Sequence, residues 1–233
     1  EWFYIPATLN NLNYPTNSSP VFGTFPNLTL CEGEPFSFNH MTTEPDGNTL
    51  VYSSVNPLED VGDPTTYTGL NTAVLPFPGI APIDALTGTL TGTPGGFHIS
   101  VLAVKVTELD PFGNIIGTVT RDIQVQIILC ANTPPVIFPV SASICVGETF
   151  MYNVTSSDAD PLDELHMEWG SEIGGATFTI INNNSVSPRP SGTFNWTPTG
   201  ADVGSHFYTV LIKDDACPVN NVNIYSFFIE VDS

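Results

Sequence analysis

Acidic side chains gather in two sets along this chain, with the spacing of groups that can hold a metal ion. In each half, an acidic loop follows one strand-like segment and an acidic pair follows a later one. The first half has Glu44, Asp46, Glu108 and Asp110, and the second has Asp158, Asp160, Asp163, Asp214 and Asp215. Carboxylate oxygens are preferred ligands of Ca²⁺, which takes about six to eight oxygens. The pattern predicts a Ca²⁺ site in each half.

The order of the strands explains why each set should meet. The strand that begins at Phe150 leads into the Asp158 loop, and the strand that begins at Phe207 leads into Asp214. Both are expected to run in the same direction, so both acidic segments should lie at one end, facing the linker around Asn132, whose carbonyls could add ligands. The alternative is a pair of turns in which the acids only accept hydrogen bonds from backbone N–H groups.

Two motifs recur along the chain. Cys31-Glu-Gly-Glu-Pro-Phe36 returns as Cys145-Val-Gly-Glu-Thr-Phe150, and a Gly-Thr segment from Gly88 to Pro94 returns as Gly192 to Pro198. Self-similarity with a period near one hundred residues indicates two copies of one module. Repeated modules more often extend or bind than catalyse, so the repetition itself bears on function.

Short segments of alternating or apolar residues, bounded by Pro and Gly, indicate strands rather than helices. The expected strands are 36–41, 49–54, 98–106 and 118–129 in the first copy, and 150–155, 165–169, 176–181, 193–196, 207–213 and 223–231 in the second. This spacing predicts an all-β protein with two tandem Ig-like or cadherin-like β-sandwiches. The boundaries predicted are a linker or the tail of a preceding repeat over 1–20, then modules over 21–132 and 133–233.

The composition narrows the partners. Four Lys and Arg residues stand against 24 Asp and Glu residues, which gives a formal net charge of −20. Binding to nucleic acid or to an anionic membrane surface needs clustered cations and is therefore not expected. No stretch is long and apolar enough to span a bilayer. Cations are the expected small partners, although an acidic surface also serves simply to keep an extracellular protein soluble.

Four cysteines and few lysines suggest an exported protein in an oxidising space. Cys31 and Cys130 end strands that should finish at the same end of the first module, so Cys31–Cys130 is the first expected disulfide. Cys145–Cys217 is left by subtraction. It fits poorly, because Cys145 precedes a strand of roughly 26 Å whose far end lies near Cys217. A pairing of Cys217 with Cys130 stays open.

Catalytic patterns are absent from the sequence, and no enzymatic activity is expected. There is no nucleophile elbow, phosphate loop or metalloprotease motif, and His40, His98, His166 and His206 are isolated. The acidic pairs could serve a glycosidase, but a duplicated active site would be unusual. Trp169 and Trp196 are expected to pack in the core of the second sandwich; a platform that stacks on sugars is the alternative.

The Cys-x-Gly-Glu-x-Phe segment, the acidic loop, the Gly-Thr-x-x-x-x-Pro segment and the strand ending in acids together resemble tandem bacterial Ig-like, cadherin-like and PKD-like repeats. Residues 19–135 are particularly similar to repeats of very long cell-surface proteins of Bacteroidetes, including gliding-motility adhesins exported by the type IX route. In such repeats the first acidic loop commonly reads Asp-x-Asp-Gly-Asp. Glu44 and Asn48 replace two of those aspartates here, which weakens the site predicted in the first half.

The resemblance implies a fragment of a long adhesin at the cell surface, acting in attachment or motility as an extended stalk that Ca²⁺ and disulfides stiffen. Its partners would be surface glycans, other extracellular polymers or neighbouring repeats of the same chain. The alternative is a carbohydrate-binding accessory module of a secreted polysaccharide-degrading enzyme. A third possibility is a purely structural stalk that binds nothing.

Overall fold

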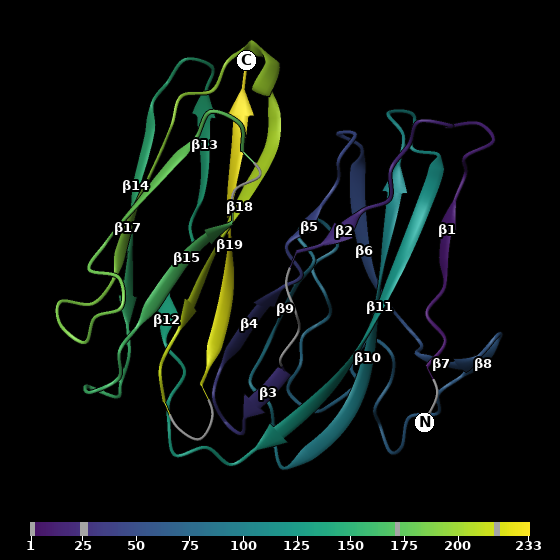
Figure 1. The fold of residues 1–233 in the computed structure, drawn as a ribbon, viewed down its shortest axis with the longest axis horizontal. Coiled ribbons are helices and arrows are strands. Elements are labelled where there is room, and N and C mark those ends of the chain that lie inside the picture. Colours follow the sequence, from purple (N-terminus) through teal and green to yellow (C-terminus); the bar gives the residue numbers. More distant parts are fainter. Residues whose placement is uncertain (1–2, 24–27, 171–172, 217–219) are drawn as a thin grey trace. The chain divides into compact units, whose positions relative to one another are not determined.

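The computed structural model confirms the all-β prediction (Figure 1). It describes residues 3–23, 28–170, 173–216 and 220–233, and within them one 3₁₀ turn is the sole helical element. No helix among these residues has the length and apolarity needed to cross a membrane. The chain divides into two compact units, the first made of residues 1–36 and 40–129 and the second of residues 37–39 and 130–233.

The main sheet of the first unit has the order β1-β11-β10-β6, with β3 added to β11, and the two-stranded ladders β2–β5 and β7–β8 belong to the same unit. A third ladder joins β9 to β4, and residues 37–39 of β4 are grouped with the second unit. The long strands of the first unit alternate buried and exposed residues, as expected for strands with one face on a core. The strands are β1 Ala7–Leu9, β2 Val21–Phe22, β3 Leu28–Cys31, β4 Phe36–Asn39, β5 Thr42–Thr43, β6 Thr49–Val55, β7 Leu58–Asp60, β8 Asp63–Pro64, β9 Thr89–Gly92, β10 His98–Leu109 and β11 Ile115–Ile128.

The second unit is a sandwich of two four-stranded sheets, β13-β19-β18-β15 and β12-β14-β17-β16. Its elements are β12 Val136–Ile137, β13 Ser141–Cys145, β14 Phe150–Ser157, β15 His166–Gly170, β16 Thr177–Ile181, β17 Ser191–Trp196, the 3₁₀ turn η1 Gly200–Asp202, β18 Gly204–Lys213 and β19 Val222–Asp232. The longer strands predicted from the sequence all appear, within a few residues of their expected ends.

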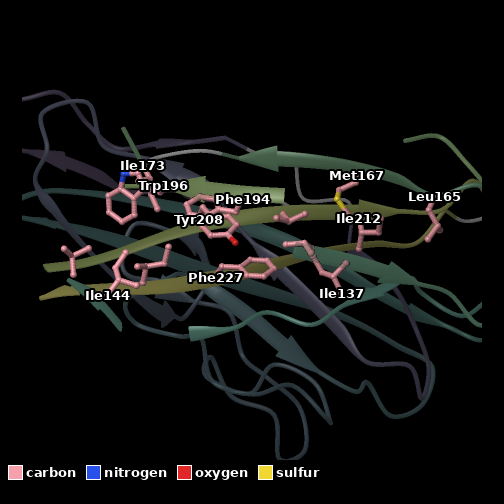
Figure 2. Close-up of a cluster of buried hydrophobic side chains, with 14 residues drawn as sticks. Ile137, Ile144, Leu165, Met167, Ile173, Phe194, Trp196, Tyr208, Ile212 and Phe227 are labelled. Atoms are coloured by element: carbon pink, nitrogen blue, oxygen red, sulfur yellow. The ribbon is translucent and has the colours of Figure 1, made fainter. Parts of the chain in front are cut away.

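The core of the second unit combines aliphatic side chains with the aromatic rings of Phe194, Trp196, Tyr208 and Phe227 (Figure 2). The ring of Tyr208 lies between those of Phe194 and Phe227, with centroid distances of 4.1 and 4.7 Å. Trp196 is only 2% exposed and belongs to the same core, whereas Trp169 stacks on Phe178 at its border. The core interpretation of the two tryptophans therefore agrees with their positions, because burial leaves the Trp196 ring no surface on which a sugar could stack.

The repeated Cys-x-Gly-Glu motif forms the same turn in both units. The Gly33 N–H donates to the Pro94 carbonyl at 2.8 Å, and the Gly147 N–H donates to the Pro198 carbonyl at 2.8 Å. Both glycines have φ values near +80°, a conformation that glycine adopts without strain. The two recurring motifs of the sequence are thus hydrogen-bonded to each other, once in each unit.

The strand pairing repeats as well. In each unit the strand that ends in the motif cysteine lies parallel to the last strand, with Cys31 opposite Ile128 and Cys145 opposite Asp232. In addition, β2 of the first unit and β12 of the second each pair antiparallel with the segment that precedes the acidic loop. A single topology has therefore been used twice, as the sequence repetition predicts.

The N-terminal segment differs from its prediction as a linker or the tail of another repeat. Strand β1 pairs antiparallel with β11, with Ala7 opposite Val119. The chain continues along the same edge, because the Asn10 N–H donates to the Ile116 carbonyl at 2.8 Å. The described part of residues 1–20 therefore belongs to the first unit, where it covers a sheet edge that would otherwise expose unpaired backbone groups.

The cysteines follow the first predicted pairing and not the second. Cys31 and Cys130 are disulfide-bonded, and the parallel strands that carry Cys31 and precede Cys130 end together as expected. Cys145 is instead a free, exposed thiol in the described part of the chain, so its predicted bond to Cys217 is corrected. Cys217 itself lies outside the described residues.

The length of β19 explains why the predicted bond between Cys145 and Cys217 does not form. Cys145 lies opposite Asp232, at the last residue of that strand. Lys213 and Val222, which flank the segment holding Cys217, pair with each other at its first residue. Ten steps of about 3.3 Å separate the two ends, whereas a disulfide needs Cα atoms within about 7 Å.

Candidate cation sites

The acidic loop of the second unit brings three carboxylates together. Asp158, Asp160 and Asp163 each offer one oxygen, and these oxygens lie within 4.8 Å of one another. The loop begins where β14 ends at Ser157, and the chain bends through it because the Asp160 N–H donates to Asp158 Oδ1 at 2.9 Å. The predicted cluster of carboxylates therefore exists. One of its members, Asp158, also accepts a backbone hydrogen bond within the turn, as the alternative interpretation proposed.

A fourth carboxylate, Asp214, follows directly after β18 and is 2% exposed. Its Oδ1 accepts the N–H groups of Ala216 and Asn221, at 3.2 and 2.9 Å. Burial is the main cause of the raised pKa of Asp158 and Asp163 in the acidic loop, and the negative charge of Asp214 raises both pKa values further. The two acidic segments of this unit thus lie at the same end, as their order in the sequence predicts.

The segment that leads into the second unit contacts both acidic segments. Asn132 donates its side-chain amide to Asp214 Oδ2 at 2.7 Å. The next residue, Thr133, donates its backbone N–H to Asp160 Oδ2 at 2.7 Å. Two successive residues therefore connect the entry segment to the loop after β14 and to the end of β18.

The electrostatics of the loop favour a cation. Burial is the largest cause of the raised pKa of Asp158 and of Asp163, and neighbouring carboxylates raise both further. The buried Oδ2 atoms of both residues find no hydrogen-bond partner among the described residues. Unpaired buried carboxylate oxygens are unfavourable, and a hard cation such as Ca²⁺ would satisfy them.

Arg189, one of the four basic residues of the chain, is hydrogen-bonded to the backbone of this loop. The Arg189 guanidinium donates to the backbone carbonyls of Asp160 and Asp163, the former at 2.7 Å. Its charge lowers the pKa of Asp158 and Asp163, which partly opposes the effect of burial. Arg189 therefore holds the backbone of the loop while leaving the carboxylates themselves available.

The first unit repeats this arrangement with different side chains. Glu44, Asp46 and Glu108 also present oxygens within 4.8 Å of one another, and Glu108 is fully buried. Glu44 Oε2 accepts the N–H groups of Asp46 and Asn48 at 2.9 and 2.6 Å, whereas its buried Oε1 has no partner among the described residues. A cation could therefore be held here too, but through fewer unpaired oxygens.

The entry segment of the first unit also contacts its acids. Asn17 donates its amide to Glu108 Oε2 at 2.9 Å, and the Ser18 N–H donates to Asp46 Oδ2 at 2.6 Å. Asn48 donates to the other Glu108 oxygen at 2.9 Å. Side-chain amides thus donate a hydrogen bond to each oxygen of the buried Glu108 carboxylate.

Two predicted ligands lie apart from the clusters. Asp110 caps the hairpin between β10 and β11, where it accepts from Tyr14 Oη, Phe112 N–H and both the N–H and the side-chain amide of Asn114. The Asn114 and Tyr14 side chains hold the pKa of Asp110 at about 2. Asp215 accepts the Glu164 N–H at 2.8 Å and so braces the end of the acidic loop.

The sequence reasoning placed the linker around Asn132 at this end of the second unit, but it missed Asn17 and Ser18 and the hydrogen bonds that both entry segments donate, although a signal was present. Asn17-Ser18-Ser19-Pro20 and Asn132-Thr133-Pro134-Pro135 share the pattern Asn-Ser/Thr-x-Pro, which begins 27 residues before Glu44 and 26 residues before Asp158. In both units the Asn amide donates to the acid at the end of the long strand, Glu108 within β10 or Asp214 directly after β18, and the next N–H donates to an acid of the loop. The repeated unit of this site is therefore an entry segment together with its carboxylates.

No protein-family model and no curated protein matches the chain. Solved structures match most of it at low identity. An endo-fucoidan hydrolase from glycoside hydrolase family 107 is 15% identical with a TM-score of 0.33, over 91% of this chain and 28% of that chain. The sialic acid binding region of a Streptococcus sanguinis SK1 adhesin is 12% identical with a TM-score of 0.34, over 93% and 78%. Drosophila N-cadherin EC1-4 is 13% identical with a TM-score of 0.30, over 93% and 50%.

This chain thus spans little more than a quarter of the fucoidan hydrolase chain and half of the cadherin chain. TM-scores in this range carry no argument about function. The inference of function therefore rests on the clusters themselves.

Proposed function

We propose that this chain is a pair of tandem repeats from a long extracellular adhesin, acting in surface attachment or motility as a stalk stiffened by Ca²⁺. The observation that carries the proposal is the site found once in each unit, in which an entry segment is bonded to two acidic segments. Because the entry segment of the second unit follows directly after the last residue of the first unit, Leu129, a cation bound there would restrict the joint between the two repeats.

The charge of the chain supports the same function. Like charges at close range disfavour one another, and a divalent cation removes that repulsion while supplying bonds that the unpaired oxygens lack. The Asn132 amide oxygen is a further ligand type that Ca²⁺ accepts. We expect the site of the second unit to bind more tightly than that of the first, because it has more unpaired carboxylate oxygens.

Titration calorimetry with Ca²⁺ tests the proposal. We expect heat from at least one site, a rise in the melting temperature, and a loss of the tighter site on Asp160→Asn substitution. Asp46→Asn should remove only the weaker site, and the exposed Glu59→Gln is the matched control that should change neither. Absence of both heat and thermal stabilisation would exclude a Ca²⁺-stiffened stalk.

The mechanical role needs a separate measurement. Small-angle scattering of the chain should give a narrower distribution of interatomic distances in Ca²⁺ than in chelator, since a restricted joint samples fewer orientations. The same narrowing should be lost in the Asp160→Asn variant. Identical scattering profiles in Ca²⁺ and in chelator would show that Ca²⁺, even where calorimetry detects its binding, does not stiffen the joint.

Carbohydrate binding is the second candidate, and one cavity favours it. A hollow of about 240 Å³ in the first unit is lined by Tyr4, Pro6 and Leu58 together with Lys105 and Asp122. An aromatic ring beside an acid and an amine is suited to one sugar residue, whose ring face is apolar and whose edge carries hydroxyls. Glycan-array binding that is lost on Tyr4→Ala, with Trp169→Phe as the control, would favour this function; a blank array would exclude it.

A further inference from the structure

The two motif cysteines occupy equivalent places but differ in their bonding. Cys31 is disulfide-bonded, whereas Cys145 is a free, exposed thiol in the described part of the chain. Each is the last residue of a strand that lies parallel to the final strand of its unit. The difference therefore does not come from the strand that carries the cysteine.

The backbone hydrogen bonds next to Cys31 and next to Cys145 are equivalent. The N–H that follows Cys31 donates to the carbonyl of its opposite residue, Ile128, at 2.8 Å. The N–H that follows Cys145 donates to the carbonyl of its opposite residue, Asp232, at 2.9 Å. The same turn then returns the N–H two residues after each cysteine to a proline carbonyl, at 2.8 Å in both units.

The bonded partner in the first unit has a fixed position relative to this frame. Cys130 stands two residues after Ile128. Residues two apart on an extended strand point to the same face, and residues opposite each other in a ladder also share a face. Cys130 lies just past the end of β11, and its disulfide bond with Cys31 shows that the two side chains meet on one side at the end of the ladder. Two residues after Asp232 is the position directly after Ser233.

We propose that Cys145 forms the closing disulfide of the second unit with a cysteine at the position directly after Ser233. This bond is the counterpart of the one at Cys31 and Cys130, so each repeat is closed by a covalent link between the strand before its Cys-x-Gly-Glu turn and the end of its last strand. Cys217 is then not the partner of Cys145. The described residues Lys213 and Val222, on either side of the segment that holds Cys217, pair at the first residue of β19, whereas Cys145 lies opposite its last residue.

The bond forms by an ordinary exchange. The Cys145 thiol and the second thiol each lose one proton, and the two electrons released on making the S–S bond reduce one small-molecule disulfide, such as oxidised glutathione, to two thiols. Exposure of Cys145 gives such a disulfide access to its sulfur.

The experiment extends the chain by one residue after Ser233, either cysteine or serine, in a Cys217→Ser background that removes the competing thiol. Both proteins are refolded in a glutathione buffer. In the cysteine-ended chain we expect the Cys145 thiol to be lost, a linked peptide to join the Cys145 segment to the C-terminus, and the melting temperature of the second unit to rise. The serine-ended chain should keep the free thiol, and Cys145→Ser in the cysteine-ended chain should abolish both the link and the thermal gain.

Two results with the protein would overturn the proposal, and the parent reading frame supplies a third test. One is a Cys145 thiol that stays free in the cysteine-ended chain under conditions in which Cys31 and Cys130 are oxidised, since the serine-ended chain controls for folding. The other is a peptide map of the unaltered chain that shows Cys145 bonded to Cys217. A parent reading frame that encodes any residue other than cysteine directly after Ser233 would likewise exclude the bond in the natural protein.

Discussion

Gly117 leaves the space that the buried acid of the first unit occupies. It lies opposite Glu108 in the β10–β11 ladder, and a Cβ at Gly117 would stand 2.6 Å from Glu108 Oε2. The Glu108 side chain cannot simply move aside, because it is fully buried and the amides of Asn17 and Asn48 hold its two oxygens.

We predict that Gly117→Ala destabilises the first unit by about 1–3 kcal/mol, the usual result of leaving a buried polar group unsatisfied. It should also weaken Ca²⁺ binding in that unit only. Chemical denaturation and calorimetry measure the two effects. Gly200→Ala is the control, since a Cβ there meets nothing within 4 Å. Equal stability of the two variants would contradict the assigned role of Gly117.

Arg189 supplies a second test at the scale of single residues. Its two hydrogen bonds to the Asp160 and Asp163 carbonyls hold the acidic loop in place, a role that a bound cation would otherwise have to fill. We predict that Arg189→Gln lowers stability by about 1 kcal/mol in chelator, a value reduced for partial exposure, and by less in saturating Ca²⁺. Arg189→Lys keeps the charge but not the paired donors, so it should resemble Gln. A loss that is larger in Ca²⁺ than in chelator would contradict this role.

At the scale of elements, β11 carries a carboxylate whose surroundings make stability depend on pH. Burial raises the pKa of Asp122 from 3.8 to about 6, and its buried Oδ2 has no hydrogen-bond partner among the described residues. The folded state thus holds the Asp122 proton more tightly than the unfolded chain does. This contribution to stability is present at low pH and is lost as pH rises from about 4 to about 6.

We therefore predict that Asp122→Asn, which mimics the protonated acid, raises the melting temperature at pH 7. The difference from the wild-type chain should disappear towards pH 4, because the wild-type carboxyl is then protonated in the folded state. Thermal unfolding of both proteins between pH 4 and 8 gives this difference directly, with Glu59→Gln as an exposed reference. A gain that is independent of pH would show that Asp122 acts by packing rather than by charge.

The strands themselves were largely predictable, because alternation and Pro-Gly boundaries are local signals. β10, β11, β14, β18 and β19 appear where the pattern placed them. The short edge strands were missed. Strand β1 spans only three residues, all exposed, so nothing in its own sequence shows that it pairs with β11.

For the whole molecule, the formal charge of −20 sets a general electrostatic cost on folding. We predict that the melting temperature in chelator rises between about 10 mM and about 150 mM KCl, over which the Debye length falls from about 30 Å to about 8 Å. Ca²⁺ added at constant ionic strength should raise the melting temperature further, because ions bound at the carboxylate clusters stabilise the folded state in addition to the screening that the salt provides. A melting temperature that falls with KCl would show that repulsion is not a main destabilising force.

The sequence by itself determined the duplication, the strand class and the spacing of the acids, since each depends on residues close together in the chain. Tertiary structure decided which of those acids share a site. Asn17 reaches Glu108 across 91 positions and Asn132 reaches Asp214 across 82. Asp110, two residues after Glu108 and just past the end of β10, instead accepts hydrogen bonds within the hairpin. Donors so far apart meet only because strand register and packing bring them together, and neither is written in any local pattern.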